Sequence, residues 1–68
     1  MNEDNFNMSI RKFLKMTGVG SQREIEQAVS QALAGGKLQG TEKLPVKIKL
    51  AIPDLGLDVD FDGEITLE

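Results

Sequence analysis

Hydrophobic residues in the first part of the chain recur at i, i+4, i+7 and i+8, the spacing of one stripe along a helix. The stripe consists of Phe6, Ile10, Phe13 and Leu14. Acidic residues precede it and basic residues lie near its end, the order that the helix dipole favours. Gly18 follows the last turn and can take the left-handed conformation that commonly ends a helix. We therefore expect a first helix over about residues 4–16.

A second helix is predicted over about residues 22–34. Ser21-Gln22-Arg23-Glu24 has the pattern of a capping box, in which the serine hydroxyl and the glutamate carboxylate each accept from the other's backbone amide. Gly35-Gly36 stops the helical pattern that follows. Its apolar stripe consists of Ile25, Ala28, Val29, Ala32 and Leu33. Residues 17–20 would then join two helices in a hairpin or a sharper corner.

Near residue 43 the hydrophobic period changes from 3.6 residues to 2, which indicates β-strands. Two alternating runs, about 43–52 and 57–67, flank Pro53-Asp54-Leu55-Gly56, which has turn chemistry. Pairing the strands across this four-residue loop places apolar residues opposite each other on one face and opposite charges on the other. The expected pairs are Ile52 with Leu57, Leu50 with Val59, Ile48 with Phe61, Lys49 with Asp60, Lys47 with Asp62, and Leu44 with Ile65.

The elements together predict one small α+β domain over residues 1–68, with both helices packed on one face of a C-terminal antiparallel hairpin. An alternative makes Asp62-Gly63 a second turn that is followed by a short third strand. Either arrangement leaves open strand edges, and a homodimer through such an edge is one expectation.

The composition narrows the range of functions. The 68 residues include no cysteine and no histidine, which excludes disulfides, thiolate nucleophiles, histidine bases and zinc sites built on sulfur or imidazole. No base is paired with Ser9, Ser21 or Ser30 by any recognisable motif, so we expect no enzyme and no cofactor. The acidic N-terminus and the lack of a long apolar run predict a cytoplasmic protein without a membrane partner.

Residues 58–65 match the first eight positions of an EF-hand calcium loop, with Asp58, Asp60 and Asp62 as the candidate ligands. The glutamate that closes the calcium shell belongs at position 12, whereas Glu68 falls at position 11. The alternation of apolar residues between the aspartates is typical of a strand. We therefore favour three aspartates on one strand face opposite lysines, with no metal, and keep an atypical calcium binder as a minor alternative.

The first helix, the glycine-containing connector, the capped helix and the hairpin also resemble a winged helix-turn-helix. Arg11, Lys12 and Lys15, together with the start of the second helix, would then contact nucleic acid. The second helix carries a net charge of −1, and the last 15 residues carry six acidic side chains and no basic one. Because these charges repel phosphates, we expect nucleic-acid binding to be weak.

These considerations favour a non-enzymatic protein–protein interaction module, although the sequence does not identify its partner. One candidate contact surface is the polar face of the second helix, and the open edges of the hairpin offer another. The polar face consists of Gln22, Arg23, Glu26, Gln27, Ser30 and Gln31.

The residues 5–15, 21–26 and 62–65 resemble a family of small uncharacterised bacterial proteins of about this length, a domain of unknown function. The resemblance covers essentially the whole chain. It implies a bacterial, cytoplasmic and stand-alone setting, and it implies no activity, ligand or catalytic residue.

Overall fold

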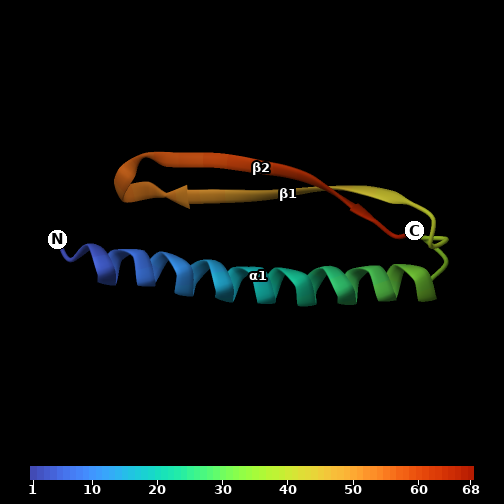
Figure 1. Cartoon of the computed structure of the whole chain (residues 1–68). Coiled ribbons are helices and arrows are strands. Elements are labelled where there is room, and N and C mark those ends of the chain that lie inside the picture. Colours follow the sequence, from blue (N-terminus) through green and yellow to red (C-terminus); the bar gives the residue numbers. More distant parts are fainter. The chain divides into compact units, whose positions relative to one another are not determined.

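The computed structural model describes residues 1–68, which form two compact units, residues 1–37 and residues 38–68. The first unit is a single helix, and the second is a two-stranded antiparallel β-hairpin (Figure 1). The fold class is therefore α+β, as the sequence predicts. The packing of helix on hairpin stays a prediction.

The N-terminal unit holds one helix, α1 (Glu3–Ala34), so the prediction of two helices is wrong. Gly18 and Gly20 lie within the helix, and neither has the positive φ of a glycine that ends a helix. A glycine inside a helix costs about 1 kcal/mol relative to alanine. Breaking the helix would instead leave up to four carbonyls and four amides to be satisfied by caps or water. A helix that continues through residues 17–20 keeps these backbone hydrogen bonds. The cost of two glycines in the helix is smaller than the cost of losing those bonds.

Both ends of α1 are capped by the residues that lie there. At the N-terminus the Asn2 side chain accepts a hydrogen bond from the Asn5 amide at 3.0 Å. At the C-terminus Gly36 has φ +76°, and the Lys37 amide donates to the Ala32 carbonyl at 2.8 Å. This is a Schellman motif, which uses a left-handed glycine to satisfy the last carbonyls. Ser21 lies inside the helix, so the predicted capping box does not start a helix there.

The hairpin consists of β1 (Lys43–Ile52), a 3₁₀ turn at Pro53–Leu55, and β2 (Leu57–Thr66). Its register confirms all six predicted pairs, from Ile52 opposite Leu57 to Leu44 opposite Ile65. The alternative turn at Asp62-Gly63 is wrong, because Gly63 pairs with Val46 inside the ladder. A turn there would have removed the apolar Leu44–Ile65 pair and the rest of the ladder beyond Gly63, which favours its continuation.

Pro45, Pro53 and Gly56 occupy positions of the hairpin where their backbone restrictions are tolerated or required. Gly56 has φ +65°, and its amide donates to the Pro53 carbonyl at 3.1 Å, which closes the turn. The Leu67 amide donates to the Glu42 carbonyl at 3.0 Å, so Glu42 occupies a hydrogen-bonded site of the ladder. Because such sites alternate along an antiparallel pair, the nitrogen of Pro45 points away from β2 and no ladder bond is lost.

Neither unit contains a buried side chain. In the helix the partly covered positions run along one side, and in the hairpin they lie mostly on the apolar face. Each unit, taken by itself, is therefore an amphipathic element.

Candidate contact surfaces

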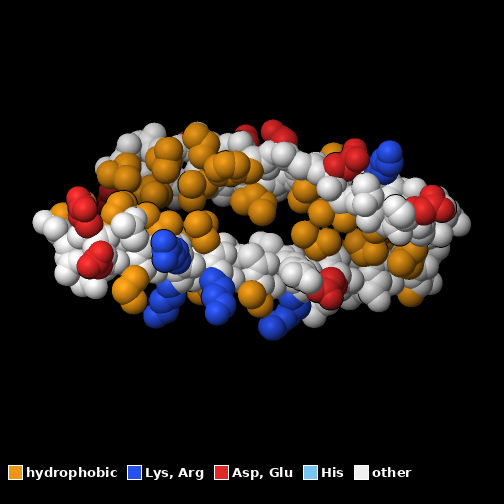
Figure 2. All heavy atoms as spheres, viewed as in Figure 1, with side chains coloured by type: hydrophobic (Ala, Val, Ile, Leu, Met, Phe, Trp, Pro, Cys, Tyr) orange, Lys and Arg blue, Asp and Glu red, His pale blue; other side chains and the backbone are white.

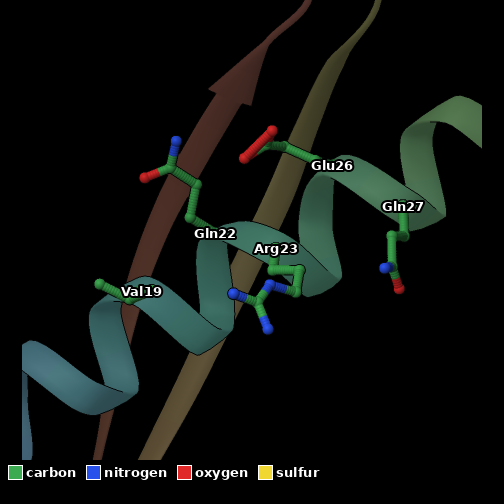
Figure 3. Close-up of a pocket in the computed structure, with 5 residues that line it drawn as sticks. All are labelled: Val19, Gln22, Arg23, Glu26 and Gln27. Atoms are coloured by element: carbon green, nitrogen blue, oxygen red, sulfur yellow. The ribbon is translucent and has the colours of Figure 1, made fainter.

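The structure places the predicted polar contact surface on the C-terminal half of α1. All six of its residues are exposed on α1. Two shallow hollows lie along it, one lined by Glu26, Gln27, Ser30 and Gln31. The other is lined by Val19, Gln22, Arg23, Glu26 and Gln27. Figure 3 shows these five side chains pointing outward from successive turns, with Gln22 and Glu26 on one side of the helix. They form a polar, solvated surface rather than an enclosed site.

The hairpin presents a second surface, which we call the apolar hairpin face. Figure 2 shows hydrophobic side chains gathered over the hairpin. At the centre of the face Ile48 and Phe61 are directly paired, yet they are 51% and 60% exposed. A face with an accessible aromatic and aliphatic centre is typical of a protein contact. The face consists of Leu44, Val46, Ile48, Leu50 and Ile52 of β1 and Leu57, Val59, Phe61 and Ile65 of β2.

Helix α1 presents a third surface, the N-terminal apolar patch. Its four side chains are between 40% and 56% exposed. They are the first stripe predicted from the sequence, namely Phe6, Ile10, Phe13 and Leu14. The helix does not have the length of continuous apolar sequence that a bilayer crossing requires. The patch is therefore the hydrophobic side of an amphipathic helix.

The opposite face of the hairpin is charged. Lys47 Nζ lies 4.0 Å from Asp62 Oδ1, and Lys49 Nζ lies 3.2 Å from Asp58 Oδ1. Lys49 thus contacts the diagonal aspartate and not Asp60, which is its directly opposite partner in the register. The right-handed twist of a two-stranded ribbon brings one diagonal neighbour closer than the other.

The three calcium candidates, Asp58, Asp60 and Asp62, lie at alternate positions of the continuous strand β2. No group of three acidic side chains in the structure is arranged to hold a metal ion. Alternate strand residues are about 7 Å apart, whereas calcium ligands converge to about 2.4 Å from the ion. The strand geometry explains why a sequence match to eight EF-hand positions does not produce the loop.

The loop before β1 contains an interaction that the sequence analysis missed. The Glu42 carboxylate accepts hydrogen bonds from the backbone amides of Gln39 at 2.8 Å, Gly40 at 2.9 Å and Thr41 at 3.1 Å. These bonds, the one from Gln39 first, outweigh desolvation and hold the pKa of the Glu42 carboxyl below its usual value. Gly40, with φ +98°, gives the loop the turn that aims these amides at one carboxylate. In the sequence, the only indication of this loop cap is that Gly40 lies two residues before Glu42.

The helix-turn-helix considered as an alternative is not present, because the continuous helix leaves no corner between its two halves. Ser21 therefore begins no helix whose free amides could meet a phosphate. Arg11 and Lys12 are adjacent in α1 and Lys15 lies about one turn further along, and Figure 2 shows basic side chains along this helix. They form a basic segment without the docking geometry of the DNA-binding motif.

The model of a family described as being of unknown function matches residues 1–68. No curated protein and no solved structure matches the chain.

Proposed function

The chain belongs to DUF6494, a family of unknown function, and we propose that it is a non-enzymatic protein–protein interaction module that binds through its apolar hairpin face. The observation that carries this proposal is the accessible Ile48–Phe61 pair at the centre of that face. A buried aromatic anchor surrounded by aliphatic residues supplies most of the affinity in many interfaces.

The apolar hairpin face supports this function better than the polar surface of α1 does. Residues such as Gln27 and Gln31 are well hydrated and lose water contacts when a partner covers them. Covering Phe61, by contrast, removes apolar area from water and contributes about 25 cal/mol for each Å². The helix surface then serves as solvated exterior, and the hairpin serves as the binding surface.

The proposal is tested by capturing partners on the tagged full chain from a bacterial lysate, with and without nuclease. Two bait variants, Phe61→Thr and Ile48→Thr, each remove one member of the anchor pair and place a β-branched residue that suits a strand. We expect both variants to lose the captured protein, and we expect nuclease to change nothing.

The matched control is Leu55→Thr, because Leu55 is 74% exposed but lies in the turn outside the apolar hairpin face. This variant should capture partners as the original chain does. Capture that survives both hairpin variants, or that nuclease abolishes, contradicts the proposal. Far-UV circular dichroism of each variant separates loss of binding from loss of folding.

A further inference from the structure

The two outer edges of the hairpin differ in how well they can accept a further strand. In an antiparallel pair every second residue of each strand has its amide and carbonyl pointing away from the other strand. The bond from Leu67 to Glu42, together with the register, identifies these outward residues. In β1 they include Pro45, which has no amide to donate, so that edge is interrupted. In β2 no proline interrupts them, and they are Asp58, Asp60, Asp62, Glu64 and Thr66.

The β2 edge has no partner strand within the chain. The sheet contains two strands only, β1 and β2. Helix α1 cannot serve as a third strand, because its backbone amides and carbonyls are bonded within the helix. This holds wherever the helix lies relative to the hairpin. An edge with a row of free backbone groups is a template for an extended segment of another chain.

The side chains of the outward residues determine which segment the β2 edge suits. Four of these five residues are acidic. Asp58 and Asp62 are each contacted by a lysine of β1, at 3.2 Å and 4.0 Å. Asp60 and Glu64 form no ion pair within the hairpin. An added strand would therefore face two uncompensated carboxylates, which favour a cation directly opposite each of them.

The edges do not suit a second copy of this chain. A two-fold pairing of β2 with β2 would place acidic residues opposite each other, and like charges in that position destabilise a ladder. Pairing β2 with the β1 edge of another copy would match opposite charges, but Pro45 removes a hydrogen bond from that ladder. Such head-to-tail pairing also has no closed end and continues from copy to copy. A basic strand without proline from another protein meets none of these obstacles.

We infer that the β2 edge binds an extended basic segment of another protein, which is added to the hairpin as a third strand. The backbone of the segment pairs with the outward amides and carbonyls of β2. Lysine or arginine at alternate positions of the segment lies opposite the acidic residues, on the polar face of the sheet. This inference goes beyond the proposed function, because it uses a strand edge and not the apolar hairpin face.

The test uses the purified full chain and a short capped peptide in which lysines alternate with valines. Amide hydrogen exchange, followed by NMR, measures the backbone pairing directly. The outward amides of β2 should exchange quickly in the free chain. Saturation with the peptide should slow exchange at Asp60, Asp62 and Glu64 at least about tenfold. The outward amides of Lys47 and Lys49, on the interrupted β1 edge, are the internal control and should not change.

Modified peptides separate strand addition from simple charge attraction. The amides of the lysines face the β2 edge in the proposed pairing, whereas those of the valines face away. N-methylation of the lysines keeps every charge and should abolish the slowed exchange. N-methylation of the valines should leave the slowed exchange intact. A peptide with glutamates in place of the lysines should not bind, because its charges repel the acidic edge.

Two variants of the chain test the uncompensated carboxylates. Asp60→Asn and Glu64→Gln should each raise the dissociation constant of the lysine peptide about twofold to fivefold. Asp54→Asn, which removes the same charge in the turn outside the edge, is the matched control and should leave it unchanged.

Three results would overturn the inference. They are exchange that the lysine peptide does not slow, slowing that survives N-methylation of the lysines, and β2 edge amides that are already protected in the free chain. The last result would mean that another copy of the chain occupies the edge. The proposed function is unaffected by any of them, because the lysate capture with Phe61→Thr measures the apolar hairpin face and not the edge.

Discussion

Glu42 acts as an internal cap for the loop that leads into the hairpin. Its pKa is lowered, chiefly by the Gln39 amide, so the ionised carboxylate is bound more tightly in the folded state. The resulting stability is present above the unfolded-state pKa and is lost as the pH falls through the folded-state pKa. Glu42→Gln should destabilise the chain at neutral pH and reduce the acid sensitivity of its melting temperature.

Thermal unfolding between neutral and acidic pH measures this effect, and NMR titration of the Glu42 side chain gives the pKa itself. Glu64→Gln, on the exposed polar face of β2, serves as the control. If the two variants have the same pH profile, the three amide bonds do not stabilise the loop.

The diagonal contact between Lys49 and Asp58 predicts a specific pattern of charge coupling on the exposed face. Both side chains are about 60% exposed, so solvent screening limits the coupling to about 0.2–0.5 kcal/mol. A double-mutant cycle with Lys49→Met and Asp58→Asn should detect it by urea unfolding. The same cycle with Asp60→Asn should give a value close to zero. A larger coupling to Asp60 would show that the directly opposite partner is the one that matters.

At the scale of elements, the continuity of α1 depends on Gly18 and Gly20. A Cβ added at either position would meet no atom within 4 Å, and neither residue has positive φ. Gly18→Ala and Gly20→Ala should therefore each stabilise the chain by about 0.5–1 kcal/mol and increase helicity at 222 nm. If residues 17–20 form a corner instead, both substitutions destabilise.

The C-terminal cap of the same helix provides the opposite control. Gly36 has φ +76°, a conformation that costs a residue with a Cβ about 1–2 kcal/mol. Gly36→Ala should lower the free energy of unfolding by about that amount. Urea unfolding of the three glycine variants together separates the glycines that continue the helix from the one that ends it.

For the whole molecule, the charge distribution sets the response to nucleic acid. Residues 1–37 carry a net charge of +1, and residues 38–68 carry a net charge of −4. Because the protein has no helix-turn-helix corner, we expect it to bind duplex DNA only non-specifically, with a Kd weaker than about 1 μM at physiological salt. Fluorescence anisotropy with two unrelated duplexes measures this, and sequence-dependent binding below that concentration would contradict it.

The sequence predicted the register of the hairpin because several local patterns specify the same pairing. The alternation of Ile48, Leu50 and Ile52 with lysines, the turn at residues 53–56, and the matching alternation in β2 all specify the same register. A shift by one residue would place every apolar side chain on the polar face. The candidate polar surface, which the sequence assigned to a separate second helix, lies on the single helix α1, and its role in binding stays a prediction.

Two features were decided only by the tertiary structure. Glycines and a capping-box pattern near Ser21 are compatible with both a corner and a continuous helix, and the choice depends on backbone hydrogen bonds over the whole segment. The Glu42 cap depends on three amides converging on one carboxylate, which only the folded loop brings together. By itself the sequence determined the hairpin register and the polarity of each face, because these follow from side-chain period. It did not determine helix continuity or loop capping, because these follow from how backbone groups are satisfied in three dimensions.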